Sequence, residues 1–521
     1  MISHLAEELL SAITNQLIES FEEDEETAPH INEAIIHRQN TGASLCLVSR
    51  RLLPYGRRVL YSHLDSRDGR VYDQDWEHGN PALRTLFYRR LKLLGQHPYL
   101  ASFVESCTIE LQDGAITEEE LGELGLVFKS CTNLRKFTLL ETSLPSEPWD
   151  EDPGQEAMEE WNRRDSARET LFRYLVDTQI TSFSKLRHLS LTMNSTSGYR
   201  QRLIKLLCRC PDLRSLDIQG LEDLLKCRSD DDSPQSILLL PNLRELSAST
   251  CHNKIIAEII AASPELRTFF LHTSQDYILP TISTPHPTLA ELTINFLHNP
   301  DNWNHPNFET STQLEKLTPF ISSFPSITKL NLTLNIAPRD RPIIAVAPST
   351  SDSLTFFTSL PHSITTLILS GQALNPVILD LTTLLPSTPL PNLTELSLYW
   401  KLQTGGSGSA TVWKDLIAAC RACDIKMGGN LGMLDRLQNT VEDLESLLEL
   451  QREFKEEMIE RRAKFMRMVD ERNAWHRDMG LAEVPLSLLP DPFDLKPHDA
   501  RAEEMREQLD SIKALIWETF S

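Results

Sequence analysis

The chain has 521 residues, which is too many for one compact core, so it contains either several units or a repeat array. Its net charge of −23 repels phosphate backbones and anionic lipid. This charge disfavours nucleic-acid or membrane binding wherever a local basic patch is lacking.

The nine cysteines have no repeated spacing. The close pairs Cys208-x-Cys210 and Cys420-x-x-Cys423 lack the further ligands of a zinc site, so we expect buried thiols and no metal or cofactor. No stretch approaches the roughly 18 apolar residues of a membrane span, and no basic region precedes an apolar run at the N-terminus. We therefore expect a cytoplasmic and/or nuclear protein.

Two apolar segments open the chain. Residues 3–20 have the helical spacing of an amphipathic helix. The acidic run 22–26 predicts a solvated loop after it. Residues 45–64 predict two short helices in succession, because Pro54 breaks or restarts a helix.

These segments resemble an F-box, in the divergent form common in fungal proteins. The pattern L-P-x-E-L-L-x-x-I is matched from Leu5 to Ile13 with Ala6 in the proline slot, and residues 47–52 and 58–61 match later parts. The resemblance implies that a helical domain, residues 1–64, binds a Skp-family adaptor and through it a cullin. The side chains implied in adaptor binding are Leu5, Leu9, Leu10, Ile13, Leu47, Val48, Leu52 and Leu60. The alternative is that these helices only cap a repeat array.

Residues 65–100 predict a helical connector, with Leu83, Leu86, Phe87, Leu91 and Leu94 on one face. The phrase leucine-x-x-leucine-x-leucine then recurs, after an eroded copy at Val104–Ile109. Apolar residues at offsets 0, 3 and 5 are typical of a short strand with one buried side, and their recurrence predicts stacked strands. The copies begin at Leu134, Leu186, Leu213, Leu243 (degenerate), Leu266, Leu289, Ile327, Ile364 and Leu393.

This array resembles the leucine-rich repeat superfamily, in an irregular version. The resemblance implies an α/β solenoid over residues 101–425, a curved parallel sheet with helices on the convex side. Helical spacing at residues 199–208 and 254–262 predicts two of those helices.

Residues 430–521 predict a C-terminal helical pair. Leu434, Leu437, Val441, Leu444 and Leu448 begin an apolar stripe on a long charged helix, and a second amphipathic helix ends the chain. We expect an antiparallel hairpin within the chain. A coiled coil to a second chain is the competing interpretation, although the heptad pattern fades after about two repeats.

Strand side chains alternate, so offsets 2, 4 and 6 should form the displayed face of the sheet. At offsets 4 and 6 the eighteen residues include one formal charge, Asp217. A nucleic-acid groove would be basic, which favours a protein target contacted by aromatic groups. The candidate target-binding residues are Phe270, His272, Tyr399 and Trp400. Alternatively the face is only solvated, and a helix or loop carries binding.

No nucleophile–base pair, paired carboxylates, phosphate loop or metal cluster is evident, so we expect no enzyme. The resemblances together imply a substrate-recognition subunit of an SCF-type cullin-RING ubiquitin ligase, holding an unknown protein target on its repeats. Two alternatives stay open: a non-catalytic repeat scaffold without a ligase role, and an enzyme whose site the sequence does not reveal.

Overall fold

The computed structural model of the protein describes the chain in sixteen stretches. The described residues are 7–27, 31–66, 81–110, 118–140, 170–176, 181–192, 199–219, 238–249, 253–274, 279–297, 317–334, 350–371, 381–387, 390–400, 409–478 and 496–520. The chain divides into two compact units. The first comprises Met1–Trp303 with Lys316–Thr328, and the second comprises Asn304–Glu315 with Lys329–Ser521.

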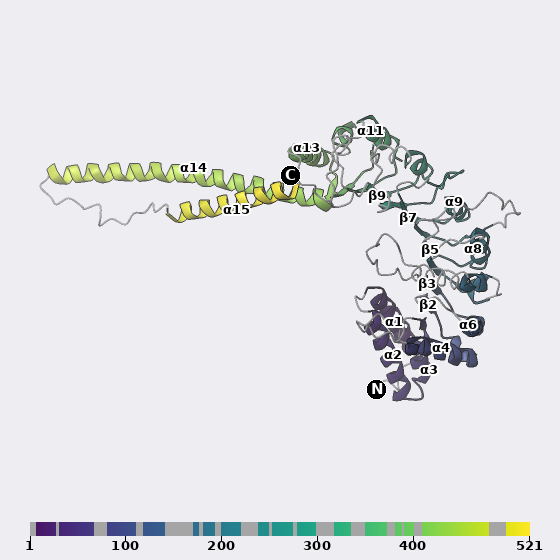
Figure 1. Ribbon diagram of the computed structural model, residues 1–521. Helices are drawn as coiled ribbons and strands as arrows, with labels where there is room; N and C mark the ends of the chain where they lie inside the picture. Colours follow the sequence, from purple (N-terminus) through teal and green to yellow (C-terminus); the bar gives the residue numbers. More distant parts are fainter. Residues whose placement is uncertain are drawn as a thin grey trace, which may run out of the picture. The chain divides into compact units, whose positions relative to one another are not determined.

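The first unit opens with three helices, α1 (Glu7–Thr27), α2 (Ile31–Val48) and α3 (Leu53–Tyr61). Figure 1 shows them packed together in purple. Pro54 lies in the first turn of α3, where its missing N–H costs nothing, so the predicted restart of the helix is confirmed. Ile18 of α1 packs against Val59 of α3 in a small core.

Three expectations for this region need correction. The acidic run 22–26 is helical as part of α1, because glutamate is a good helix former and its charge does not interrupt a helix. The helix before Pro54 is not short, since α2 begins at Ile31. The segment also ends in a strand, β1 (His63–Asp65), whose pairing to β2 was not anticipated from the sequence.

The helical connector is present as α4 (Pro81–Gln96) and α5 (Pro98–Ala101). Leu91 and Leu94 are buried as expected, Phe87 is half-buried, and the side chains of Leu83 and Leu86 lie outside the described set. The other helices named in the first unit are α6 (Glu118–Ser130), η2 (Thr181–Lys185), α8 (Tyr199–Leu207) and α9 (Asn253–Ala261). The last two match the helices predicted over 199–208 and 254–262.

Among the described residues, twelve strands form a sheet in which strand order follows chain order, and the registered pairs are parallel. The strands of the first unit are β1, β2 (Ser106–Glu110), β3 (Lys136–Leu140), β4 (His188–Thr192), β5 (Ser215–Gln219), β6 (Glu245–Ser249), β7 (Thr268–Ser274) and β8 (Glu291–Leu297). The eroded and degenerate copies of the leucine phrase are both genuine strands, β2 and β6. In Figure 1, α6, α8 and α9 lie on one side of these strands. The predicted α/β repeat architecture is confirmed.

Equivalent positions of successive repeats pair directly, which stacks their buried side chains. Leu189 is in register with Leu216, Leu216 with Leu246, and Leu246 with Phe269. Near the start of the array the interior is aromatic: the rings of Phe128, Phe137 and Phe183 lie 5.7–5.9 Å apart, centroid to centroid. All three rings are buried.

The second unit contains β9 (Lys329–Leu334), β10 (Thr366–Gly371), β11 (Glu395–Trp400) and the short β12 (Lys426–Gly428), which the leucine phrase does not mark. Its helices are α11 (Thr350–Ser359), α13 (Ser409–Ala422), α14 (Gly429–Asp478) and α15 (Lys496–Phe520), with the short turn η5 (Leu385–Ser387). Gly429 adopts φ +60°, a left-handed conformation, and lies against the Leu398 carbonyl at the point where β12 turns into α14.

The C-terminal helices pair antiparallel, as expected. Lys455 contacts Asp499 at 2.6 Å and Glu445 contacts Lys513 at 2.7 Å, so residue numbers fall along α14 as they rise along α15. Figure 1 shows α14 and α15 side by side. Several apolar side chains of α14 remain exposed, among them Leu447, Leu450, Ile459 and Met468.

Candidate functional site

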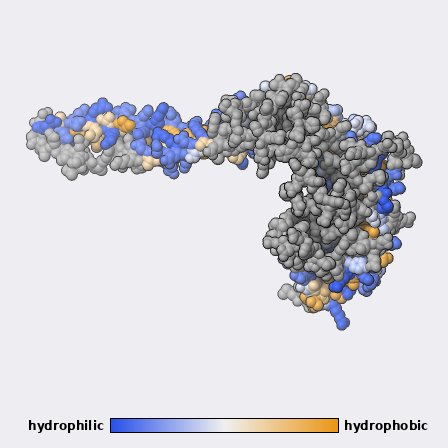
Figure 2. All heavy atoms as spheres, viewed as in Figure 1, coloured by the Kyte–Doolittle hydropathy of each residue, from blue (hydrophilic) through white to orange (hydrophobic). Residues whose placement is uncertain are grey.

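An apolar patch lies on the N-terminal helices. Leu47 and Val48, in the last turn of α2, are 87% and 65% exposed, and Leu9 and Ile13 of α1 are 47% and 40% exposed. Leu9 and Ile13 are one helical turn apart and share a face of α1. Figure 2 shows apolar, orange atoms gathered at the lower end of the view, over the N-terminal helices. We call Leu9, Ile13, Leu47 and Val48 the N-terminal patch.

Two contacts bring the parts of this patch to one end of the helical group. The hydroxyl of Tyr55, at the start of α3, donates to the Glu7 carbonyl of α1 at 3.4 Å. Gly56, one residue later, lies against Cys46 of α2. The first turn of α1 and the last turn of α2 therefore both lie beside the start of α3.

The remaining predicted adaptor residues lie elsewhere. Leu10 and Leu52 are buried within the protein itself, 5% and 3% exposed, so the expectation that they contact a partner is corrected. Leu60 is half-buried, and Leu5 lies outside the described residues.

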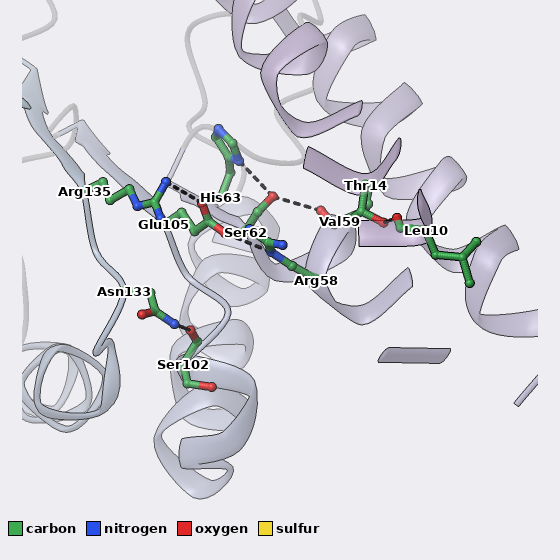
Figure 3. A network of polar contacts seen from close by, with 10 residues as sticks. All are labelled: Leu10, Thr14, Arg58, Val59, Ser62, His63, Ser102, Glu105, Asn133 and Arg135. Carbon is green, nitrogen blue, oxygen red and sulfur yellow. Dashed lines mark hydrogen bonds and ion pairs between the residues drawn. The ribbon is translucent and has the colours of Figure 1, made fainter. Parts of the chain in front are cut away.

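A polar junction joins the N-terminal helices to the repeats (Figure 3). The Arg58 guanidinium of α3 donates to Glu105 Oε1 through Nη2 at 2.7 Å and through Nε at 3.0 Å. Arg135 lies 3.9 Å from the other oxygen of Glu105. The Ser62 carbonyl accepts from the N–H groups of Glu105 and Ser106 at 2.7 and 3.0 Å. The helices are thus joined to the first strands by the Arg58–Glu105 ion pair and by the backbone hydrogen bonds of the Ser62 carbonyl.

The displayed face of the sheet has the expected alternation. In β5 the side chains of Leu216 and Ile218 are buried, while those of Ser215, Asp217 and Gln219 reach the opposite face. Asp217 Oδ2 accepts hydrogen bonds from Ser190 and Gln219, each at 3.0 Å. Asp217 Oδ1 is shielded from solvent and has no hydrogen-bond partner among the described residues.

The four candidate target-binding residues do not form one described cluster. Phe270 and His272 lie on β7 of the first unit. Phe270 is 38% exposed, and His272 Nδ1 is 3.3 Å from the Asn295 amide nitrogen. Tyr399 lies on β11 of the second unit and is 48% exposed. The Trp400 side chain lies outside the described set. Ser397, although at offset 4, is buried because β12 packs beside it.

One charged feature of the sheet was missed because only offsets 2, 4 and 6 were considered. At offset 1, directly before five successive strands, the residue is always arginine. The signal in the sequence is the dipeptide Leu-Arg, repeated in five consecutive copies of the phrase. The column consists of Arg135, Arg187, Arg214, Arg244 and Arg267.

The described cysteines are free thiols. The expectation that they are buried holds for four of them and is wrong for the other three: Cys107, Cys131, Cys210 and Cys420 are buried, Cys46 is half-buried, and Cys208 and Cys423 are exposed. Burial raises the pKa of Cys131, Cys210 and Cys420 to about 12, and raises that of Cys107 well above its usual value. These groups are therefore protonated and unreactive at neutral pH.

The raised pKa values predict a loss of stability in alkali. Below about pH 8.5, the ordinary pKa of cysteine, the thiols are neutral in both folded and unfolded chains. As the pH rises from there toward about 12, the pKa of buried Cys131, Cys210 and Cys420, only the unfolded chain ionises, so the free energy of unfolding falls. Urea denaturation between pH 7 and pH 10 measures this, and Cys210→Ala should flatten the dependence. Identical slopes for that variant and the wild type would contradict the assignment.

Among the described residues, no three His, Cys, Asp or Glu side chains are grouped as metal ligands. None of the described helices is both long and apolar enough to cross a bilayer.

No protein-family model and no curated protein matches the chain. Among solved structures, the chain is similar to the leucine-rich repeat-containing protein LegL7 from Legionella pneumophila. That match has 15% sequence identity and a TM-score of 0.32, and it covers 62% of this chain and 82% of the other. The parallel strands of this chain follow chain order, with helices between many of them, which is an α/β repeat fold.

Proposed function

We propose that this protein is a non-catalytic substrate receptor of an SCF-type cullin-RING ubiquitin ligase. Its N-terminal helices bind a Skp-family adaptor, and its repeats hold a protein target. Ubiquitin transfer is carried out by other subunits, and this chain contributes by raising the local concentration of the target. The F-box resemblance of residues 5–13, 47–52 and 58–61 supports the adaptor.

The observation that carries this proposal is the exposure of the N-terminal patch. Leu47 at 87% and Val48 at 65% exposed are adjacent apolar side chains at the end of α2, and Leu9 and Ile13 are exposed on one face of α1. An exposed apolar group of this kind is typical of a protein-binding surface. The Arg58–Glu105 ion pair attaches the helices to the repeat array, so a bound adaptor would be held at a fixed place relative to β2.

A pull-down with purified Skp-family adaptor tests the proposal. The variant Leu9→Asp/Leu47→Asp places two charges in the contact, and we expect adaptor binding to weaken by at least about tenfold, because desolvating each unpaired charge is unfavourable. Both side chains are exposed, so circular dichroism and the urea midpoint should stay close to those of the wild type.

Leu126→Asp is the matched control. Leu126 is 50% exposed on α6, away from the N-terminal patch, and the same chemical change there should leave adaptor binding intact. The SCF proposal is contradicted if the adaptor does not bind the wild-type protein, or if it binds the double variant as tightly as it binds the Leu126→Asp control.

The second candidate is a repeat scaffold whose N-terminal helices only cap the sheet. The pairing of β1 with β2 favours it, because the helices run directly into the first strand and cover its edge. On this reading deletion of residues 1–64 exposes the edge of β2 and causes aggregation, and neither form binds the adaptor. Adaptor binding by the full chain distinguishes the two functions.

A further inference from the structure

The five arginines before β3–β7 are held next to one another by their own backbones. The N–H of Arg187 donates to the Arg135 carbonyl at 2.7 Å, and Arg214, Arg244 and Arg267 each donate to the preceding arginine of the column at 2.8 Å. The side chains therefore leave the edge of the sheet at the spacing of parallel strands, about 4.8 Å. We call these residues the arginine column.

Four members of the column carry an uncompensated charge. Arg214, Arg244 and Arg267 are exposed and Arg187 is half-buried. Within the described part of the chain, no carboxylate lies within ion-pair distance of these four guanidinium groups. Like charges on neighbouring strands are unfavourable. In a chain of net charge −23, this basic row is a local exception.

Arg135, the fifth member of the arginine column, lies close to a carboxylate of the protein itself, that of Glu105. Glu105 occupies the next position along, before β2, and its N–H bonds continue the same backbone ladder. Its carboxylate lies 3.9 Å from Arg135 and 2.7 Å from Arg58. An arginine–carboxylate ion pair is thus already present at one end of the row. The other four arginines can form the same kind of ion pair with a carboxylate of another molecule.

We propose that Arg187, Arg214, Arg244 and Arg267 bind an acidic segment of a partner protein, laid across the strands with its carboxylates against the guanidinium groups. Binding of an acidic segment through these arginines rests on the proposed function of the repeats, which is to hold a protein target. It does not depend on adaptor binding.

The surroundings favour a peptide over a nucleic acid. The residues that flank Arg214, Arg244 and Arg267 in the sequence include the exposed carboxylates Asp212, Glu245 and Glu265, so the row does not widen into a basic surface there. A nucleic-acid backbone requires a broader basic surface than a single row of arginines. An extended peptide is narrow enough to follow a single row. Phe270 of β7 is exposed about 10 Å further along the chain from Arg267, within the length of such a peptide.

A fluorescence-anisotropy titration of the full chain tests the proposal. The probe is a labelled peptide of about ten residues with alternating glutamate and serine, long enough to span the four strands. The variant Arg214→Gln/Arg244→Gln/Arg267→Gln removes three charges from the column. We expect its affinity to be about tenfold weaker, because each exposed ion pair contributes modestly, and wild-type binding to weaken with salt.

Arg436→Gln/Arg467→Gln/Arg472→Gln is the charge-matched control, since it removes three exposed arginines from α14. It should bind the peptide like the wild type, and both variants should retain adaptor binding. Absence of peptide binding by the wild type, or equal loss in both variants, overturns the proposal. Preference for a single-stranded oligodeoxythymidine probe over the peptide overturns it in favour of nucleic acid.

Discussion

Replacing Phe137 by alanine should lower the free energy of unfolding of the first unit by about 3–5 kcal/mol. The ring is fully buried and contacts two other rings, those of Phe128 at 5.7 Å and Phe183 at 5.8 Å. Alanine leaves a cavity that the rigid parallel ladder on both sides of β3 cannot close. Urea denaturation followed by circular dichroism should show the transition at a clearly lower urea concentration.

Phe270→Ala is the control for this experiment. It removes the same side chain from the same kind of repeat strand, but Phe270 is 38% exposed on the displayed face. Its ring lies on the displayed face and not in the core, so we expect a much smaller change than for Phe137, about 1 kcal/mol. Equal losses for both variants would show that the aromatic cluster does not hold the start of the array together. A target contact through Phe270 would be lost in the control without loss of stability.

Replacing Gly56 by alanine should destabilise the N-terminal helices by about 1–3 kcal/mol. A Cβ at this position would lie 2.7 Å from the Cys46 backbone nitrogen and 2.8 Å from the Gly42 carbonyl oxygen. Both are backbone atoms of α2, so no side-chain rotation relieves the overlap, and α2 and α3 must separate. Amide hydrogen exchange of α2 and α3 measures the loss locally, even if the whole chain does not unfold in one step.

The matched control is Gly122→Ala in α6, where a Cβ would meet no atom within 4 Å. Alanine should stabilise that helix by about 0.5–1 kcal/mol, because glycine loses more conformational freedom on folding. Separation of α2 from α3 also shifts Leu47 and Val48, so Gly56→Ala should weaken adaptor binding if the proposed function holds. Unchanged exchange rates in α2 and α3 would contradict the close helix contact.

The repeat strands could be predicted from sequence because the signal is local and repeated. Each copy of the leucine phrase places buried side chains at offsets 0, 3 and 5. Successive copies stack with equivalent positions next to one another, and this stacking makes the strands parallel. Even the degenerate copy ending at Ala248 is a strand, because its neighbours on both sides fix its register. β1 and β12 lack the phrase and were missed, since they are strands through pairing alone.

The candidate surfaces were less predictable. Leu9 and Leu10 are adjacent in the sequence and both apolar, yet Leu9 is 47% exposed and Leu10 is 5% exposed. Which of them faces a partner depends on how α1 rotates against α2 and α3, and the closeness of α2 and α3 is set by Gly42 and Gly56.

By itself, the sequence determined the repeat architecture, the C-terminal helical pair and the neutral, hydroxyl-rich rows of the sheet face. Tertiary structure alone decided which N-terminal leucines reach the surface and how the helices join the array through Arg58 and Glu105. It also turned five dispersed Leu-Arg dipeptides into one row of charge. The physical reason is that periodicity encodes which side of an element is buried, whereas exposure and charge clustering depend on contacts between residues far apart in the chain.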